Sequence, residues 1–214
     1  MAQELSGMKI AIIATQDFEE SELTEPKKAL EAAGAKTVVI SQKPGKIQAV
    51  RHDEKSIQVD VDLTFDQVQA SEFDGVQIPG GALNADTLRV VPEAQDFVRE
   101  MDRAGKPIAV ICHGPWLLVS AGLVRGRKMT SYHTIQDDLR NAGAEWQDAE
   151  CVRDKNWVSS RQPSDLPAFN KEMIRLFSSA GARSASRKTK AQRRERRKTL
   201  TQRTPRKTGE KKQK

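Results

Sequence analysis

The chain has little cysteine and no long apolar run. Its 214 residues include only two cysteines, Cys112 and Cys151, too few for the disulfide framework of a small secreted domain. No stretch approaches the roughly 20 apolar residues that a membrane-spanning helix needs. The N-terminal segment has an acidic residue where a signal peptide has basic ones, and its apolar run is short. We therefore expect a protein of the reducing cytoplasm with no membrane partner.

Acidic and basic residues are distributed unevenly along the chain. Residues 178–214 contain 15 Lys and Arg against two Asp and Glu, whereas residues 1–177 contain 21 against 27. The positive net charge of the whole chain, +7, therefore comes from residues 178–214, because residues 1–177 are net acidic. That end has Leu200 as its only large apolar residue and cannot bury a core. We predict one α/β domain over residues 1–177 and a basic, disordered tail over residues 178–214.

Two interpretations of the tail are open. Its cluster Arg193–Lys198 contains no aromatic residue, so contact with a nucleic acid would be electrostatic and independent of base sequence. Alternatively, the tail is a solvated run of charge without a partner. We retain nucleic acid as a candidate partner.

Short apolar runs alternate with helical segments along the predicted domain. This alternation favours a doubly wound, flavodoxin-like α/β fold, in which helices sandwich a mostly parallel sheet. Ligands of such folds bind at the carboxyl ends of the strands, where the loops 17–22, 80–86 and 112–116 are expected to meet. The predicted strands cover residues 8–14, 36–41, 75–78, 107–111, 144–152 and 156–160, with a β-hairpin within 46–63, and the predicted helices cover 20–33, 92–104, 116–121, 134–142 and 164–177.

The sequence around Cys112 combines a buried strand, a bend and a helix. The strand covers residues 107–111, the bend is Cys112-His-Gly-Pro115, and an apolar helix follows. A thiol at this place lies at a helix N-terminus, where unpaired N–H groups favour the thiolate. The arrangement resembles a nucleophile elbow, although Val110 is larger than the residue usual at that position. The alternative is a small buried hydrophobe without chemistry. We favour a reactive cysteine.

Several stretches together resemble the DJ-1/PfpI superfamily, in its PfpI-type and general-stress-protein branch. The block Ile111-Cys-His-Gly-Pro115, preceded by an acidic residue after the first strand, is the most specific of them. The resemblance spans nearly all of residues 8–177 and implies the class I glutamine amidotransferase-like fold. The matching stretches are D17-F-E-E-S-E-L23, F73-D-G-V-Q-I-P-G-G81, A85-D-T-L-R89, G105-K-P-I-A-V-I-C-H-G-P-W116, R125-G-R-K-M-T-S131, N141-A-G-A-E-W146 and V158-S-S-R-Q-P-S-D-L-P-A-F-N170.

The resemblance implies a nucleophile, Cys112, and an acid that touches it, matched here by Glu19. An ionised carboxylate beside a thiol would raise the pKa of that thiol. Glu19 would therefore help only as a neutral carboxylic acid that donates a hydrogen bond to the thiolate. Without the resemblance, Glu19 would be interpreted as a solvated acid at a helix start.

The resemblance also gives a role to His113. Because His113 adjoins Cys112, we expect its ring to face away from the thiol. The resemblance implies that an acid from a second subunit orients this ring, so the site is completed in a homodimer or higher oligomer. Asp86 is the matching position, and a helix N-cap is the alternative role for it.

Further residues are assigned to the substrate side of the site. Backbone N–H groups of Gly81 and His113 would form an oxyanion hole beside Gly80, where glycine permits close approach. Trp116 is expected either to form a wall of the pocket or to pack in the core. His133 is interpreted as a loop residue and Cys151 as a core residue.

Three functions follow from these assignments. The first is a stress-protective cysteine hydrolase, similar to a protein deglycase or glyoxalase III, that acts on methylglyoxal- and glyoxal-type carbonyls or their adducts. The second is an intracellular PfpI-type cysteine peptidase, and the third is a redox-sensing chaperone without turnover. No cofactor and no metal are implied. A glutamine amidotransferase is disfavoured because no H-x-E follows Cys112.

Overall fold

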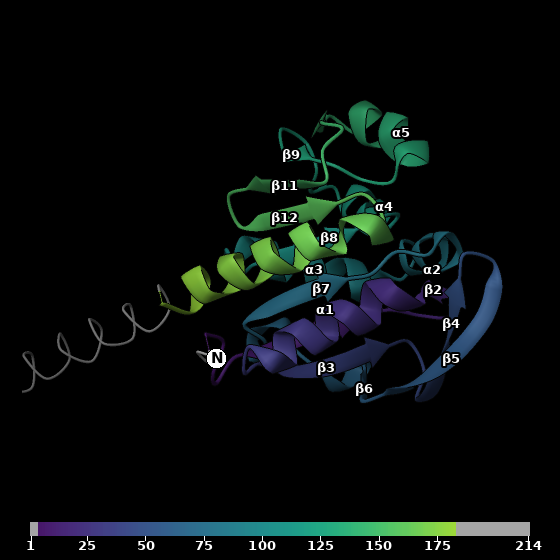
Figure 1. Cartoon of the computed structure of the whole chain (residues 1–214), viewed down its shortest axis with the longest axis vertical. Coiled ribbons are helices and arrows are strands. Elements are labelled where there is room, and N and C mark those ends of the chain that lie inside the picture. The colour runs from purple at the N-terminus through teal and green to yellow at the C-terminus, as the bar shows by residue number, and fades with distance from the viewer. Residues whose placement is uncertain (1–3, 183–214) are drawn as a thin grey trace, which may run out of the picture.

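A computed structural model describes residues 4–182 as a sheet between two layers of helices (Figure 1). The predicted tail lies outside the described residues, apart from its first five. The main sheet has the strand order β11-β12-β8-β7-β1-β3-β6 and is parallel except for the pairing of β11 with β12. The predicted α/β fold is confirmed. The strands of this sheet are β1 (Lys9–Ile13), β3 (Lys36–Ser41), β6 (Leu63–Thr64), β7 (Gly75–Ile78), β8 (Ile108–Ile111), β11 (Cys151–Asp154) and β12 (Trp157–Ser160).

The helices cover both faces of this sheet because alternate strand residues point to opposite sides. In β8, Ile108 and Val110 join the core beneath α3, whereas Ala109 and Ile111 join the core beneath the C-terminal helix. In Figure 1, α1 and the C-terminal helix cross in front of the sheet and α3 lies behind it. The helices are α1 (Glu20–Ala32), α2 (Ala82–Leu88), α3 (Pro92–Arg103), α4 (Pro115–Ser120), α5 (Gln136–Asn141) and the C-terminal helix over 166–182, with 3-10 turns at Phe65–Gln67, Ala70–Glu72, His133–Ile135 and Pro163–Asp165.

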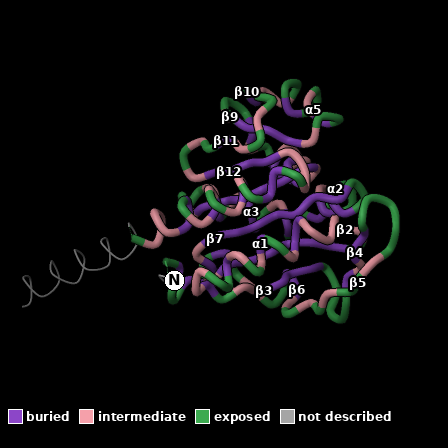
Figure 2. The backbone as a smooth tube through the Cα atoms, in the orientation of Figure 1, coloured by how far each residue is buried: buried purple, intermediate pink, exposed green. Residues whose placement is uncertain are grey.

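A second, three-stranded sheet carries the predicted hairpin. It contains β2 (Phe18–Glu19), β4 (Gly45–Arg51) and β5 (Glu54–Val61) in the order β2-β4-β5. Figure 2 shows that the outer strand of this hairpin is far more exposed than the strands of the main sheet. Because β2 directly precedes α1, the hairpin lies beside the helix that begins at Glu20.

Three local predictions differ from the structure. The strand predicted at 144–152 is divided between β11 and the short β10 (Glu145–Trp146), which pairs with β9 (Lys128–Met129). Residues 82–86, predicted as part of the loop 80–86, belong to α2, and the last helix continues beyond 177 to the last described residue. Among residues 4–182, no helix has the length and apolarity needed to cross a bilayer.

Candidate active site

Cys112 lies where the sequence predicts it, between the end of β8 and the start of α4. Its backbone has a φ of 62°, the left-handed conformation that non-glycine residues rarely adopt. Backbone hydrogen bonds hold it there: its N–H donates to the carbonyl of Ser160 (3.1 Å), and its carbonyl accepts from the N–H of Tyr132 (2.9 Å). The side chain is buried and 6% of the residue surface is exposed. Backbone strain at a buried thiol in a strand-to-helix bend is typical of a functional position.

The acid in contact with this thiol is Glu22, so the prediction that Glu19 makes this contact is wrong. Glu22 is completely buried, and its carboxyl interacts with the Cys112 side chain. Its Oε2 accepts the N–H of Gly80 at 2.8 Å. Glu22 lies on the inward face of α1, together with Leu23, Pro26 and Leu30. It precedes Pro26 by four residues and Leu30 by eight, a spacing that places all three on the same face of a helix.

Burial determines the protonation of this pair. Desolvation raises the pKa of Glu22 to about 8, against the lowering effect of the Gly80 N–H. Desolvation also raises the pKa of Cys112, and an ionised Glu22 would raise it further. The thiol therefore lacks the lowered pKa that the sequence led us to expect. The raised pKa of Glu22 favours its neutral form at neutral pH. A neutral Glu22 does not repel the thiolate, and it carries a proton that it can donate to the sulfur.

Backbone donors partly offset the burial of the sulfur. The N–H groups of Gly81 and His113 face Cys112 and lower the pKa of its thiol. Gly81 has a φ of 86°, and a Cβ there would lie 2.6 Å from the carbonyl oxygen of Asp17. Only glycine allows the chain to pass this close to the backbone of residues 17–19. The two donors expected for an oxyanion hole are therefore brought together with Cys112.

His113 turns toward the thiol, in contrast to the prediction that neighbouring side chains would diverge. Its Nδ1 lies 3.2 Å from the Cys112 Sγ, and its Nε2 lies 3.2 Å from the Thr134 Oγ1. The left-handed backbone of Cys112 explains the difference, because it redirects the thiol relative to an ordinary extended or helical residue. Burial lowers the pKa of His113, which favours the neutral ring.

A cavity of about 470 Å³ opens over the thiol. Glu19 lines it without being the acid at the sulfur, and its Oε2 accepts the N–H of His52 at 3.0 Å. This bond fixes the tip of the β4–β5 hairpin at the mouth of the cavity. The lining residues are Glu19, Glu22, His52, Asp53, Gly81, Ala82, Cys112, His113, Tyr132, Gln162, Pro163 and Ser164.

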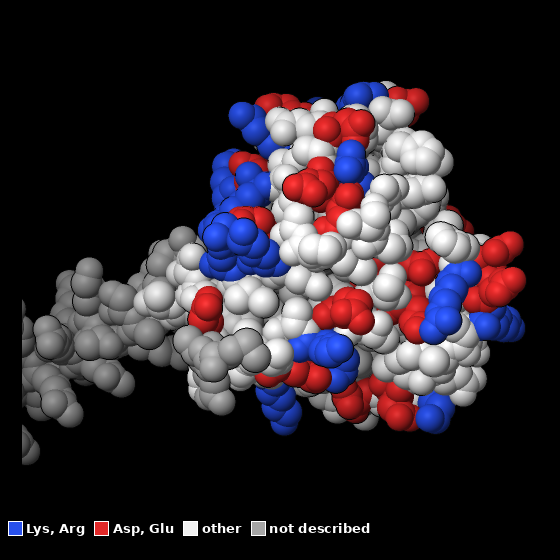
Figure 3. Space-filling model, viewed as in Figure 1, with Lys and Arg blue, Asp and Glu red and all other residues white. Residues whose placement is uncertain are grey.

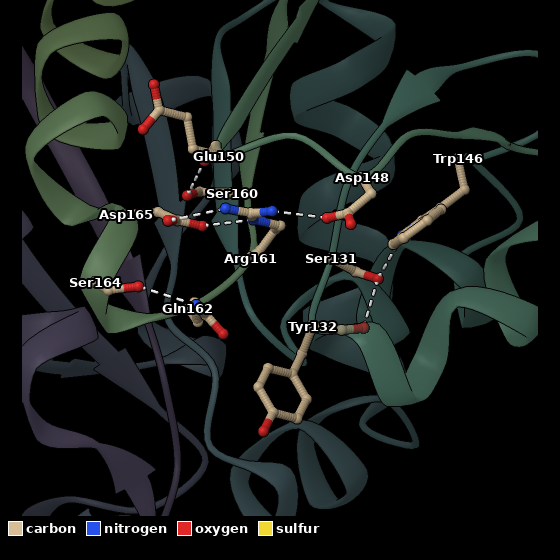
Figure 4. A network of polar contacts seen from close by, with 10 residues as sticks. All are labelled: Ser131, Tyr132, Trp146, Asp148, Glu150, Ser160, Arg161, Gln162, Ser164 and Asp165. Carbon is tan, nitrogen blue, oxygen red and sulfur yellow. Dashed lines mark hydrogen bonds and ion pairs between the residues drawn. The ribbon is translucent and has the colours of Figure 1, made fainter.

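Another wall of the cavity is formed by the loop after β12, which a network of polar contacts holds (Figure 4). Arg161 binds both oxygens of Asp165, at 2.8 and 3.2 Å, and also contacts Asp148 at 2.7 Å. Within the same loop, the amide of Gln162 donates to the Ser164 hydroxyl at 2.9 Å. The network thus fixes the segment that supplies Gln162 and Ser164 to the cavity.

Asp86 and Trp116 lie outside this cavity in the described chain. Asp86 lies in α2, where the nearby Leu83 and Val90 are 64% and 71% exposed. Trp116 packs its ring against His113, with centroids 5.4 Å apart, and donates its indole N–H to Asp138. It therefore buttresses His113 from outside the pocket.

The remaining assignments concern His133 and Cys151. His133 stacks on Tyr132 with centroids 4.5 Å apart and does not line the cavity. Cys151, predicted as a core residue, is only half-buried and packs against the edge of the core beneath the C-terminal helix.

Sequence reasoning missed Glu22, Tyr132 and Thr134. Glu22 had a usable signal, its helical spacing to Pro26 and Leu30 on the buried face of α1. Tyr132 and Thr134 had none, because only the tertiary fold brings the segment after β9 against His113.

A buried cysteine at the carboxyl edge of a flavodoxin-like sheet, in contact with a buried acid, defines a class of cysteine-centred α/β proteins. Residues 8–176 match the model of the DJ-1/PfpI family, and the chain belongs to that family. The predicted family is confirmed.

Two relatives and one solved structure illustrate the similarity. The Deglycase TK1284 of Thermococcus kodakarensis is 45% identical over 170 residues, covering 79% of this chain and 99% of that protein. The protein/nucleic acid deglycase 2 of Escherichia coli is 44% identical, covering 79% and 97%. A two-domain protein of Anabaena variabilis with DJ-1/ThiJ/PfpI-like and ferritin-like domains superposes with a TM-score of 0.76 at 35% identity, covering 82% of this chain and 49% of that protein.

Proposed function

We propose that the chain is a cysteine-dependent, protective deglycase with glyoxalase III-like chemistry, acting on methylglyoxal- and glyoxal-type carbonyls or their adducts. The observation that carries the proposal is the contact between the Cys112 thiol and the carboxyl of the completely buried Glu22, whose pKa burial raises, at the floor of a small cavity. Relatives named deglycases, which this chain matches over nearly their whole length, support the same substrate class.

The reaction begins with addition of the thiolate to the aldehyde carbon. The thiol proton passes to the His113 Nδ1, 3.2 Å from the sulfur. A carbon–sulfur bond forms, and the carbonyl electron pair moves to oxygen, which takes up that proton from His113 to give a neutral hemithioacetal. The N–H groups of Gly81 and His113 are the donors placed to hold that oxygen, because they face the sulfur to which the carbon is bonded. The neutral Glu22 donates to the sulfur before attack and stabilises the thiolate without adding a charge.

His113 is the group placed to move protons. Its Nδ1 lies 3.2 Å from the sulfur, and the neutral ring can accept a proton from the carbon bonded to that sulfur. Returning this proton to the neighbouring carbonyl carbon, while the hydroxyl proton passes to the ketone oxygen, oxidises the former aldehyde to a thioester and reduces the ketone to an alcohol. Water then releases the acid, so methylglyoxal plus water gives lactate without an external oxidant.

The size of the cavity favours small carbonyls over an extended peptide. Its volume is about 470 Å³, and the hairpin tip and the loop after β12 line its sides. A peptidase would need an open groove on both sides of the thiol. The free thiol that the reaction requires is consistent with a reducing cytoplasm.

The decisive experiment measures loss of methylglyoxal and formation of lactate by the full chain and by Cys112→Ser. We expect turnover by the full chain and a loss of at least about a thousandfold in the variant. Casein is the parallel substrate. Casein cleavage with no methylglyoxal turnover would establish the peptidase instead, and addition of oxygen to Cys112 by peroxide without either activity would indicate the redox sensor.

We also propose that the site is completed by a second copy of this chain. Asp86 is exposed on α2 between two exposed apolar residues, Leu83 and Val90. Such side chains are expected to be covered in an assembly. The Asp86 carboxylate of one copy would then orient His113 of the other, alongside the contact that Thr134 makes within the subunit.

A further inference from the structure

The helix that carries Glu22 contains a proline in its interior. Pro26 lies six residues after the start of α1 at Glu20, beyond the first turn, where proline is normally tolerated. In an α-helix, the backbone N–H of each residue donates to the carbonyl oxygen four residues earlier. Proline has no N–H, so the carbonyl oxygen that loses its helical donor at Pro26 is that of Glu22. The acid at the thiol therefore belongs to a residue whose own helix does not bond its carbonyl.

A buried glutamine of the main sheet supplies the missing bond. The side-chain amide nitrogen of Gln77 donates to the Glu22 carbonyl oxygen at 2.9 Å. Both residues are completely buried, so bulk water does not reach this carbonyl. The nitrogen of the amide must face it, because the amide oxygen is an acceptor and cannot bond another oxygen. Gln77 thus provides from the sheet the donor that Pro26 removes from the helix.

Packing of the sheet does not explain a glutamine at this position. Gln77 lies in β7, where it pairs with Ile12 on one side and Ala109 on the other. Its neighbours Val76 and Ile78 join the apolar core on the opposite face of the strand. Among residues 4–182, the Gln77 Oε1 has no hydrogen-bond partner. A buried polar group with an unpaired oxygen is unfavourable compared with an apolar side chain, so the bond to Glu22 is the evident role of this amide.

The same strand also holds the carboxyl group of Glu22. Figure 3 shows acidic and basic side chains together over the outer face of α1, where water solvates them. Glu22 instead points inward, and its Oε2 accepts the N–H of Gly80 at 2.8 Å. Gly80 follows the end of β7 at Ile78 by two residues. β7 and the turn after it therefore hold Glu22 at two points, its main-chain carbonyl and its carboxyl group.

We propose that Gln77 is a positioning residue, which holds the first turn of α1 so that the Glu22 carboxyl meets the Cys112 thiol. Without this amide, the Glu22 carbonyl would be buried with no donor, and the turn would have to move to find one. Catalytic contacts are sensitive to displacements of about 1 Å, even when the cause lies away from the reacting atoms. The inference deepens the proposed function, and only its kinetic readout rests on that function.

The test uses two substitutions whose effects should cancel. Gln77→Met removes the amide donor and keeps a side chain of similar length, so the Glu22 carbonyl loses its partner. Pro26→Ala restores a backbone N–H at position 26, which can donate to the same carbonyl in an ordinary helical bond. The double variant therefore has a donor for this oxygen again. A packing defect at position 77 would not be repaired by a new N–H at position 26.

Gln95→Met is the matched control. The Gln95 amide also donates to a backbone carbonyl, that of Arg89 at 2.7 Å. Gln95 lies in α3 and does not line the cavity over the thiol. This variant therefore loses the same kind of bond at a distance from the site. Thermal unfolding of all full-length variants establishes which of them fold.

The first readout is the rate at which iodoacetamide alkylates Cys112 between about pH 6 and 10, followed by peptide mass. We expect Gln77→Met to slow alkylation at pH 7 by about fivefold, because a displaced Glu22 no longer donates a proton to the thiolate. The double variant, Pro26→Ala and Gln95→Met should keep the profile of the native chain. This measurement needs no turnover, so it tests the role of Gln77 even if methylglyoxal is not a substrate.

The second readout is the turnover of methylglyoxal. We expect kcat to fall by about tenfold in Gln77→Met at a nearly unchanged KM, and to recover in the double variant. An alkylation rate at pH 7 that is unchanged or raised in Gln77→Met would overturn the proposal. So would a defect that persists in the double variant, or a failure of both of these variants to fold. If Gln77→Met alone fails to fold and the double variant has native rates, the proposal is supported.

Discussion

Glu22 and Cys112 lie so close to Gly80 that one methyl group on its Cα would meet both of them. A Cβ at Gly80 would lie 2.5 Å from the Glu22 Oε2 and 2.6 Å from the Cys112 Cβ. The acid, the glycine and the thiol come from three different elements, α1, the end of β7 and the end of β8. Their contact therefore depends on the tertiary fold, which brings these three elements together.

The two candidate acids can be separated by matched amide substitutions. Glu22→Gln removes the proton donor that faces the thiol, whereas Glu19→Gln changes only the wall of the cavity. We expect Glu22→Gln to lower kcat/KM for methylglyoxal by about a hundredfold, in the range of a lost general acid, and Glu19→Gln by less than about tenfold. Steady-state kinetics of both variants provide the measurement. A larger loss of kcat/KM in Glu19→Gln than in Glu22→Gln would identify Glu19 as the acid that assists the thiol.

The raised pKa of Glu22 predicts a particular dependence of stability on pH. Because burial raises the pKa to about 8 in the folded protein, against about 4.3 in an unfolded chain, the folded state retains a proton that the unfolded state loses. The free energy of unfolding should therefore fall as pH rises from about 4 to about 8. Urea midpoints measured over this range should fall in the native chain and fall less in Glu22→Gln. Parallel curves would show that Glu22 is ionised in the folded state.

Gly80→Ala should separate the acid from the thiol. The added methyl group cannot fit without movement of Glu22 or of the backbone at Cys112. We expect loss of about 1–3 kcal/mol of stability from overpacking, together with loss of nearly all turnover. Gly122→Ala is the control, because its φ of 75° imposes backbone strain while its Cβ meets nothing within 4 Å. Equal activity in the two variants would contradict the close contact of Glu22 and Cys112 with Gly80.

The polar network beneath the loop after β12 should affect substrate binding more than the chemical step. Arg161→Ala releases Asp165 and Asp148 and loosens the segment that carries Gln162 and Ser164. We expect a rise in KM of about tenfold with a smaller change in kcat. The control is Arg175→Ala, which removes an exposed ion pair with Glu172. A fall in kcat at unchanged KM would contradict this positioning role.

The exposed apolar residues of α2 predict an interface between copies of the chain. Leu83→Asp together with Val90→Asp should shift the sedimentation of the protein toward the monomer. Turnover should fall with it, because His113 would lose the acid of its neighbour. A mixture of Asp86→Asn and Cys112→Ser chains should recover part of the activity if sites are shared. An unchanged mass in the double variant would exclude α2 from the interface.

The sequence predicts the sheet more completely than it predicts the site. Apolar runs such as residues 8–14 and 107–111 mark buried parallel strands, because strands covered on both faces are apolar throughout. The bend at Cys112 is equally visible, since Gly114 and Pro115 limit how the chain can continue. By contrast, the direction of the His113 ring depends on one left-handed φ at Cys112 that no local pattern specifies.

There is a physical reason why the sequence pointed to Glu19 as the acid at the thiol, whereas the structure places Glu22 there. Both carboxylates lie near the start of α1, and sequence alone favours exposure for an acid because burial of a charge is costly. Burial raises the pKa of Glu22 to about 8, which favours the neutral acid at neutral pH and lowers the cost of burying it, and the residue name does not reveal this state. Helical spacing to Leu30 would have identified the inward face of the helix.

The backbone of Cys112 also bears on how this position is kept through sequence change. A left-handed conformation costs an ordinary residue about 1–2 kcal/mol, from which glycine is exempt. If stability alone determined the residue, position 112 would be glycine. We therefore expect the Cys112→Gly variant to have a higher melting temperature than the native chain. The presence of sulfur at this strained point thus reflects a demand that folding itself does not impose.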